Sequence, residues 1–300
     1  MTVENCTGAE RRAQQRAPAT RPAYTAVPAS HYTYDDLAEI YNRSRVDYIV
    51  PMPMNARRME EYIQFYDVRL DASVVTLDED GSAIAVGMLG LRGDQAWLTR
   101  LGVIPERRGR GKGLFTMTAL LERAVDLGAR SATLEVIEGN EPARHLFAKL
   151  GFQPMRKLLV IRRPPGPSNS APPTESIKPM SEDEIMACLR AREPGASWLD
   201  ATESLLNAGS LEGLSTHLAS GEYGCIVYRY NIFQLSHFLI RTWPPGNAHL
   251  AETLLRAVHH QHAAQDSKME NIPLDSPYWP AFQQVGYSDS FVRIEMACDL

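Results

Sequence analysis

The feature that most restricts the folding of this 300-residue chain is a proline-rich segment near its middle, Arg162–Pro179 (RRPPGPSNSAPPTESIKP). Its six prolines cannot continue a helix, and they favour an extended, solvated spacer. The segment therefore divides the chain into two parts, each of a size expected for one domain. We predict a disordered leader over 1–30, a first domain over 31–163, a linker over 164–177 and a second domain over 178–300.

Composition disfavours several classes of protein. The net charge of −5, with 31 basic and 36 acidic residues, argues against a dedicated nucleic-acid binder. No apolar run approaches about 18 residues, so we expect no membrane partner. The four cysteines stand singly, which disfavours a disulfide framework and fits a reducing cytoplasm. His259, His260 and His262 lack a carboxylate or thiol at ligand spacing, so we interpret them as a solvated face or a helix C-terminus and expect no metal.

The first part alternates between helical and strand patterns. Apolar residues recur at helical spacing in four segments: 34–44, 55–68, 114–128 and 141–151. Branched and apolar runs predict five strands: 72–78, 82–92, 96–104, 132–138 and 156–163. Two helices, a strand meander and then a β-α-β-α-β series favour an α/β domain with a mixed central sheet.

The second part repeats some of this plan. AFQQVGY (281–287) matches LFAKLGF (146–152), and the same spacing sets Asp275 opposite Asn140. Other short matches lie upstream in the same order. Several matches in one order indicate a diverged duplicate of the first part.

The most informative short motif is RRGRGKG (Arg107–Gly113), which lies between a predicted strand and a predicted helix. Glycines allow unusual backbone angles, so several N–H groups can converge on one point. The first turn of a helix adds unpaired N–H groups and the positive end of its dipole. Together with the cations Arg107, Arg108, Arg110 and Lys112, the loop is expected to bind a phosphate or diphosphate.

Two common phosphate motifs do not fit this loop. A nucleotide-hydrolysing loop needs Ser or Thr after its lysine, but Lys112 is followed by Gly113. In a dinucleotide-binding turn the third glycine would fall at Leu114. The pattern that remains is R-x-x-G-x-G, formed by Arg108, Gly111 and Gly113.

Two segments resemble the signatures of the GNAT superfamily of acyl-CoA-dependent N-acyltransferases. LGVIPERRGRGKG (101–113) is similar to the strand and loop that bind the coenzyme diphosphate, and EGNEPARHLFAKLGF (138–152) is similar to the second signature. The likeness covers roughly residues 31–163. It implies a GNAT-like α/β fold which, with the internal repeat, is duplicated in tandem with a degenerate second copy.

The resemblance implies an N-acetyltransferase that uses acetyl-CoA as cosubstrate. The acetyl group would pass to a primary amine, on a small molecule or a peptide N-terminus, by direct attack in a ternary complex. The implied coenzyme-binding residues are Leu101, Val103, Arg108, Gly109, Arg110, Gly111, Lys112, Gly113, Leu114, Asn140 and Phe147. The Val103 N–H would also polarise the thioester carbonyl.

The chain departs from the family where many members carry a tyrosine that protonates the leaving thiolate. Phe147 stands there and cannot donate a proton, so the alternative is a catalytically weak coenzyme A-binding sensor or interaction protein. Glu135 and Glu138, on the strand beside the expected cleft, are the candidate general bases. His145 is interpreted as an exposed helix residue.

Two further segments are interpreted from their place in the chain. In the second part RTWPPGNAH (241–249) stands opposite the glycine loop, and Pro244 and Pro245 lack N–H donors. We therefore expect residues 178–300 to act as a scaffold or as a wall of the acceptor pocket. Tyr48 and its methionine neighbours, between the first two helices, either border the acceptor site or pack in the core.

Overall fold

The computed structural model of the chain describes residues 24–167 and 172–300. The first half contains, in order, β1 (Thr25–Pro28), the 3-10 helix η1 (Ala29–His31), α1 (Tyr34–Arg43), α2 (Ala56–Phe65), β2 (Val74–Leu77), β3 (Ala83–Arg92), β4 (Gln95–Val103), the 3-10 helix η2 (Pro105–Arg107), α3 (Lys112–Asp126), β5 (Ser131–Ile137), α4 (Glu141–Lys149) and β6 (Gln153–Arg163).

The second half follows a related order. It contains β7 (Ile177–Pro179), α5 (Glu182–Arg190), the 3-10 helix η3 (Trp198–Asp200), α6 (Thr202–Ala208), β8 (Leu211–His217), β9 (Tyr223–Tyr230), β10 (Gln234–Trp243), α7 (Ala248–Gln261), β11 (Asp266–Pro273), α8 (Trp279–Gln284) and β12 (Ser288–Asp299). The expected α/β architecture with a mixed sheet is confirmed. In the part of the chain described, no helix combines the length and hydropathy needed to cross a bilayer.

Side chains at the helix starts explain where several helices begin. Thr33 accepts a hydrogen bond from the Asp36 amide while the Asp36 carboxylate accepts from the Thr33 amide, which is a complete capping box. Ser181 and Glu184 form the same capping box at the start of α5, and Asn140 and Asn247 are the N-caps of α4 and α7. The two halves therefore share capping chemistry as well as element order.

The leader is shorter than the sequence analysis predicted. Thr25–Pro28 forms β1, which pairs with β2, and Ala29 is fully buried. These residues contribute apolar contacts at the edge of the sheet, where Pro28 is tolerated because an edge position needs no donor there. The first 23 residues of the predicted leader, and 168–171 of the predicted linker, lie outside the described residues.

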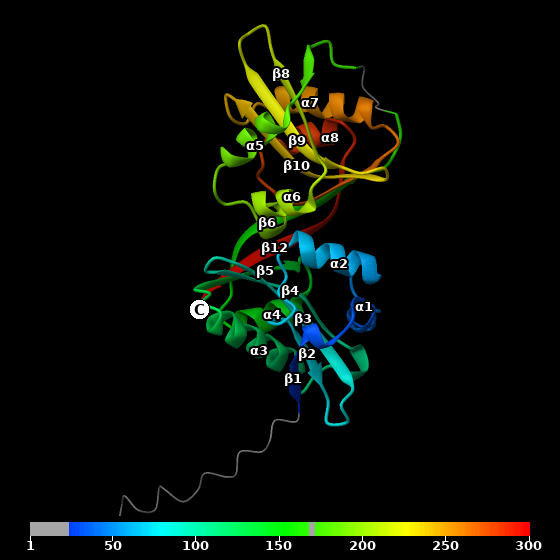
Figure 1. Ribbon diagram of the computed structural model, residues 1–300, viewed down its shortest axis with the longest axis vertical. Coiled ribbons are helices and arrows are strands. Elements are labelled where there is room, and N and C mark those ends of the chain that lie inside the picture. The colour runs from blue at the N-terminus through cyan, green and yellow to red at the C-terminus, as the bar shows by residue number, and fades with distance from the viewer. Residues whose placement is uncertain (1–23, 168–171) are drawn as a thin grey trace, which may run out of the picture.

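All twelve strands found in the described residues form one sheet, in the order β1-β2-β3-β4-β5-β12-β6-β11-β10-β9-β8-β7. The two halves exchange their last strands: β12 lies antiparallel between β5 and β6, and β6 lies antiparallel beside β11. Figure 1 shows β6 and β12 crossing between the two lobes, with the C-terminus in the lobe of the first half. Each half therefore completes its sheet with a strand from the other.

A chain that ends at Tyr287 is expected to lose its cooperative thermal unfolding transition. Removing β12 leaves β5 and β6 without their shared partner and removes the buried Ile294 and Met296 from the core. Circular dichroism melts check this, with a chain ending at Asp299, which keeps β12, as the control. A truncated chain that melts like the control would contradict the structural importance of the exchange.

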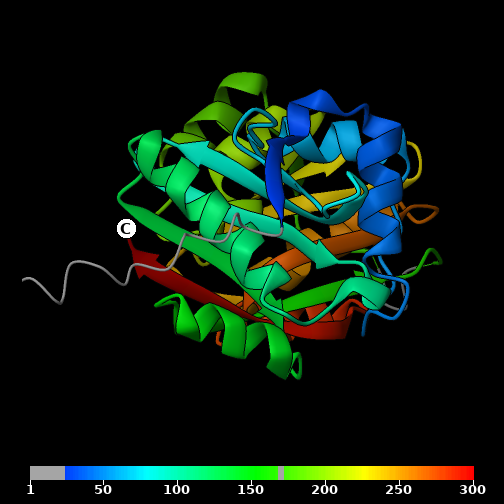
Figure 2. The same cartoon turned by 90° about the horizontal axis from the view of Figure 1, so that it is seen from below.

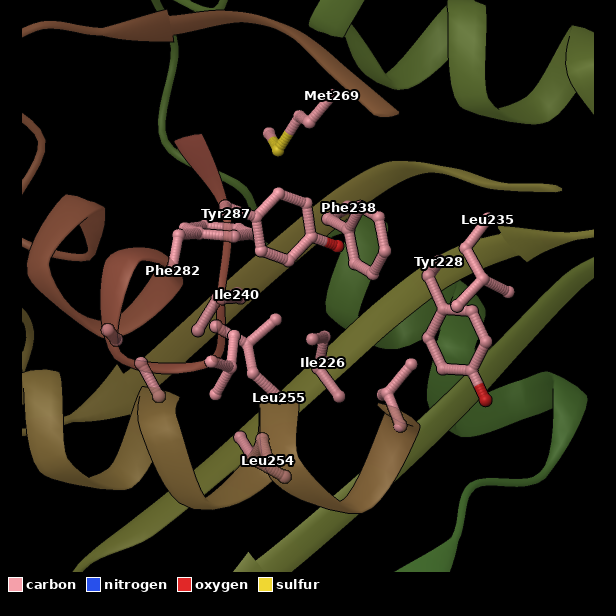
Figure 3. Packing of buried hydrophobic residues seen from close by; sticks show 14 of the residues in the cluster. Ile226, Tyr228, Leu235, Phe238, Ile240, Leu254, Leu255, Met269, Phe282 and Tyr287 are labelled. Carbon is pink, nitrogen blue, oxygen red and sulfur yellow. The ribbon is translucent and has the colours of Figure 1, made fainter. Parts of the chain in front are cut away.

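Apolar clusters cover the two faces of the sheet. In the first half one cluster packs β4 and β5 against α3 and α4, and a second packs the opposite face against α1 and α2. The helices on the two faces are visible in the view from below (Figure 2). The core of the second half joins β9 and β10 to α7 and α8, and its aromatic members Phe238, Phe282 and Tyr287 lie together in Figure 3.

Candidate functional site

A cavity of about 110 Å³ opens where β4 and β5 diverge. The two strands are parallel and pair only through Gln95–Trp97 and Ser131–Thr133. Beyond these residues β5 continues its pairing with β12 alone. Arg100 adopts a left-handed backbone conformation, with φ +54°, at a bulge against β3. The bulge and the divergence together leave one edge of β4 unpaired beside the cavity.

The cavity passes between the strands and is lined from both faces of the sheet. Trp97 and Tyr62 belong to the cluster on the α1–α2 face, whereas Leu134 and Phe147 belong to the cluster on the α3–α4 face. A ligand that enters from one face can therefore meet a second ligand that enters from the other.

The free edge of β4 presents an unpaired backbone donor. The Ile104 amide donates to Ile84 of β3 at 2.9 Å, and neighbouring residues in a strand point their amides to opposite edges. The Val103 N–H therefore faces the cleft, and it has no acceptor among the residues described. The Leu101 carbonyl faces the same way and accepts from Arg45 Nη2 at 3.1 Å.

The glycine-rich loop enters α3 through a left-handed residue, Gly111, followed by the right-handed Lys112, which is the backbone step of an anion-binding nest. Gly109, Arg110 and Gly111 are all left-handed, with φ of +88°, +51° and +79°, and α3 begins directly after them. Within 24–167 and 172–300, no acceptor is found for the amides of Gly109, Arg110, Gly111, Gly113 and Leu114. These amides are available to oxygen atoms of a bound anion.

The cationic side chains of the loop are mostly engaged elsewhere. Arg107 pairs with Asp78 at 2.9 Å. Arg108 forms a bidentate pair with Asp47, whose closer N–O distance is 2.6 Å, and the arginine hydrogen bonds lower the pKa of Asp47. Both guanidinium groups thus brace the loop against neighbouring segments.

Lys112 is buried, and its ammonium lies 5.4 Å from the centre of the Tyr24 ring. Arg110 is exposed and has no partner in the described part of the chain, so it is the loop cation left for a ligand. The positive potential of the loop comes mainly from its amides and the α3 dipole rather than from four free cations.

Asn140 and Phe147 both line the cavity. The Asn140 side chain accepts from the Ala143 amide at 3.3 Å and donates to the Tyr48 hydroxyl at 3.4 Å. Phe147 is buried and packs edge-on against Phe152, with ring centres 6.2 Å apart. Tyr48 also lines the cavity, which brings the connection between α1 and α2 to the site.

Of the two predicted general bases, Glu135 lines the cavity. Its Oε2 accepts from Trp97 Nε1 and its Oε1 accepts from Asn271 Nδ2, both at 2.9 Å. Burial raises the pKa of Glu135 to about 7, against the opposing charge of Arg293. A carboxyl group with such a pKa can accept a proton near neutral pH.

Glu138 does not line the cavity. Its carboxylate is half-exposed and forms a salt bridge to Lys157 at 2.7 Å. The two candidate general bases therefore differ in their surroundings. Of the two, only Glu135 lies at the cleft.

The neighbouring polar groups on β4 and α4 are held by other residues. Thr99 Oγ1 lies 2.6 Å from the Tyr62 hydroxyl, and Arg100 Nη1 donates to the Tyr41 hydroxyl at 2.8 Å. His145 is exposed, as expected, and its Nδ1 lies 2.8 Å from the Glu141 carbonyl oxygen.

The second half contributes three charged or polar residues that the sequence analysis did not select. Arg293 Nη1 donates to Asn271 Oδ1 at 2.9 Å and lies 2.8 Å from Glu270 Oε2. Arg293 and Glu270 also line the cavity. The strand exchange places Arg293 here, because β12 is the neighbour of β5.

Glu270 is the duplicate of Glu135. The spacing that relates Phe282 to Phe147 also relates Glu270 to Glu135, so the internal repeat contained a signal for this residue. Burial alone would raise the pKa of Glu270, but Lys268 and Arg293 outweigh it and lower the pKa below its usual range. The duplicate carboxylate therefore stays ionised as a partner of Arg293.

The loop of the second half that corresponds to the nest uses its donors internally. The Gly246 amide donates to the Tyr278 hydroxyl at 3.2 Å, and the Asn247 amide donates to Thr242 Oγ1 at 3.1 Å. Pro244 and Pro245 have no N–H group. A diphosphate at this loop would find few available donors.

The sequence model of the acetyltransferase (GNAT) family matches residues 34–152. The chain is 30% identical over 83 residues to a putative ribosomal protein bS18-alanine N-acetyltransferase of Bacillus subtilis (strain 168), covering 28% of this chain and 55% of that protein. It is 30% identical over 135 residues to mycothiol acetyltransferase of Tsukamurella paurometabola, covering 37% and 45%. The chain thus spans about half the length of these curated relatives.

The fold is similar to that of a solved tandem GNAT protein from the clavulanic acid biosynthesis pathway. The TM-score is 0.63 and the identity 15%, with 92% of this chain and 98% of that chain covered. At this identity the likeness concerns the fold alone, and it confirms the tandem arrangement expected from the internal repeat.

Proposed function

We propose that this chain, whose residues 34–152 belong to the GNAT family of acetyltransferases, moves an acetyl group from acetyl-CoA to a primary amine. The observation on which the proposal rests is the set of five amides in the glycine loop that have no acceptor among the described residues, next to the open edge of β4. The diphosphate of the coenzyme carries several anionic oxygen atoms, and each of these amides can donate a hydrogen bond to one of them. Oxygen anions bind well to amides at a helix N-terminus.

The coenzyme would lie along the α3–α4 side of the cleft. The amides of Gly109, Arg110, Gly111, Gly113 and Leu114 would hold its diphosphate, while Leu101 and Val103 would bind its pantetheine arm through backbone groups. Asn140 and Phe147 would contact it from α4. The Val103 N–H, which is unpaired in the described structure, would stabilise the oxyanion formed when the amine attacks the thioester carbonyl.

Glu135 would act as the general base. A lysine-like amine has a pKa of about 10 and is protonated at neutral pH, so a proton must leave before attack. Glu135 lies at the cavity with a pKa raised to about 7, which suits proton transfer from the amine directly or through water. Glu138 is a poorer candidate because Lys157 neutralises it at the surface.

The leaving thiolate would need a proton source other than Phe147. When the tetrahedral adduct collapses, the carbon–sulfur bond breaks and the sulfur takes the electron pair. Tyr48 lines the same cavity beside Asn140 and can supply a proton to that sulfur. The second half would form the opposite wall through Glu270 and Arg293, in keeping with its expected part in the acceptor pocket.

The acceptor would be a small-molecule amine or a peptide N-terminus. The names of the two relatives refer to an alanine of a ribosomal protein and to mycothiol. We propose a cytoplasmic enzyme, because the four cysteines stand singly in the sequence, which disfavours a disulfide framework of the kind found in secreted domains.

Release of the coenzyme thiol tests the proposed function. The full chain is mixed with acetyl-CoA and a panel of small amines and an alanyl peptide, and free thiol is measured over time. Amine-dependent release supports acetyl transfer. Tight binding of acetyl-CoA without amine-dependent release would instead support a coenzyme A-binding sensor.

Replacing Asn271 by aspartate is expected to move the acid limb of the kcat/KM profile to higher pH. A second carboxylate next to Glu135 raises its pKa further, so activity falls at pH 7 and recovers as the pH increases. Asn231→Asp adds the same charge at a turn outside the cavity and should leave the profile unchanged. An unshifted profile in the Asn271 variant would contradict the assignment of Glu135.

A further inference from the structure

The second half has a larger cavity, of about 400 Å³, at the place that duplicates the active-site cleft. β10 and β11 are parallel and pair only through Gln234–Leu235 and Asp266–Ser267 before they diverge. His237, at the bulge in β10, is left-handed with φ +55°, as Arg100 is in β4. The volume lies in the range of roughly 300–1,000 Å³ that is usual for small-molecule sites.

The coenzyme does not suit this cavity. The corresponding loop satisfies the Gly246 and Asn247 amides with Tyr278 and Thr242, so a diphosphate would have to displace two internal hydrogen bonds. Tyr278 also lines the cavity and occupies part of the space beside the loop. A different and smaller ligand is required.

Two arginines line this cavity, and one of them, Arg241, is not paired with a carboxylate in the described part of the chain. Arg192 binds both the carboxylate and the backbone carbonyl of Asp200, so that pair is neutralised internally. Glu193 is exposed to solvent. Arg241 is bound only weakly, to the Cys188 carbonyl at 3.4 Å and over the Trp243 ring, and has no carboxylate partner in the described part of the chain.

A buried hydroxyl in the same wall also lacks a partner. Ser197 is 2% exposed, lines the cavity, and its Oγ forms no hydrogen bond in the structure as described. An unpartnered buried hydroxyl costs free energy that a ligand acceptor can recover. Arg241 and Ser197 thus place a cation and a neutral donor in the wall of the same cavity.

The remaining wall is largely apolar. Phe238, Met269 and Phe282 line the cavity and belong to the core cluster of the second half, where Figure 3 shows them on neighbouring elements. We propose that this cavity binds a small carboxylic acid with an apolar body, whose carboxylate is held by Arg241 and Ser197. The proposal does not depend on acetyl transfer in the first half.

Calorimetric titration of the full chain with benzoate, hexanoate and benzyl alcohol tests the site. Benzoate or hexanoate is expected to bind, and Arg241→Met should weaken that binding by about tenfold or more, since a charge-assisted hydrogen bond is lost. Arg241→Lys keeps the positive charge and should retain most of the affinity. Arg190→Met removes an exposed arginine from α5 and should bind as the wild type does.

Three outcomes would overturn the proposal. The first is that neither acid binds to the wild-type chain. The second is that benzyl alcohol, which has the apolar body without the charge, binds as tightly as benzoate. The third is unchanged binding in an Arg241→Met variant that retains the wild-type melting temperature.

Discussion

Glu135→Gln is expected to lower kcat/KM by about 10²–10⁴-fold while the affinity for acetyl-CoA stays unchanged. Glutamine can accept one of the two hydrogen bonds that Trp97 and Asn271 now donate, through its carbonyl oxygen, but it cannot accept the proton of the amine. Steady-state kinetics with an amine that supports thiol release measure the change in kcat/KM. Calorimetry measures the affinity for acetyl-CoA separately.

The pH dependence provides a second signature of the same residue. Burial raises the pKa of Glu135 to about 7, and only the ionised carboxylate accepts a proton. The kcat/KM of the wild type should therefore rise with pH through about 7. In Glu135→Gln this rise should disappear, and only the titration of the amine itself should remain.

Glu138→Gln is the matched control for this prediction. It makes the same chemical change on the same strand but removes only a half-exposed salt bridge to Lys157. Exposed ion pairs contribute little, so activity should stay within about twofold of the wild type. A large loss in Glu138→Gln with a small one in Glu135→Gln would reverse the assignment of the base.

Gly111→Glu is expected to weaken acetyl-CoA binding by about 100-fold or more. Gly111 is left-handed with φ +79°, a conformation that costs a side-chain-bearing residue roughly 1–2 kcal/mol. The new carboxylate also places a negative charge next to the amides that would hold the diphosphate. Titration calorimetry with the full chain measures the loss of affinity.

Gly128→Glu controls for backbone strain alone. Gly128 follows α3 with φ +87°, and a Cβ atom at either glycine would meet no other atom within 4 Å. The control should therefore lose a similar amount of stability and keep its coenzyme affinity. Equal affinities in the two variants would contradict the proposed role of the loop amides.

The elements that form the site could be predicted because their chemistry is local. The left-handed turn at Gly109 and Gly111 favours glycine, and the helix that begins at Lys112 follows from its apolar spacing. The N-cap at Asn140 is likewise a property of a few neighbouring residues. Such features depend on short-range sterics and hydrogen bonds, which a single sequence records.

The partners of those elements could not be predicted in the same way. The residue pattern of Ser288–Asp299 is that of a strand. It does not indicate that this strand pairs with β5 and β6 of the first half rather than with strands of the second half. Arg108 was expected to face the ligand, but Asp47, far away in sequence, holds its side chain. Pairing across the fold depends on tertiary packing, which local patterns do not determine.

The two copies of one carboxylate show this limit most clearly. Glu135 and Glu270 occupy equivalent positions in the repeat, yet the pKa of the first is raised by burial and that of the second is lowered by Lys268 and Arg293. Lys268 lies two residues before Glu270 on β11, where the repeat has Thr133 beside Glu135, so this part of the difference is present in the sequence. Arg293 lowers the pKa of both carboxylates and reaches Glu135 only because β12 pairs with β5.

A crystal structure of the full chain with bound coenzyme A tests the central claim most directly. The account predicts one coenzyme per chain, with diphosphate oxygens about 3 Å from the amide nitrogens of Gly111 and Gly113. A diphosphate bound at the second-half cavity, or held only by side chains while the loop amides point to solvent, would contradict it.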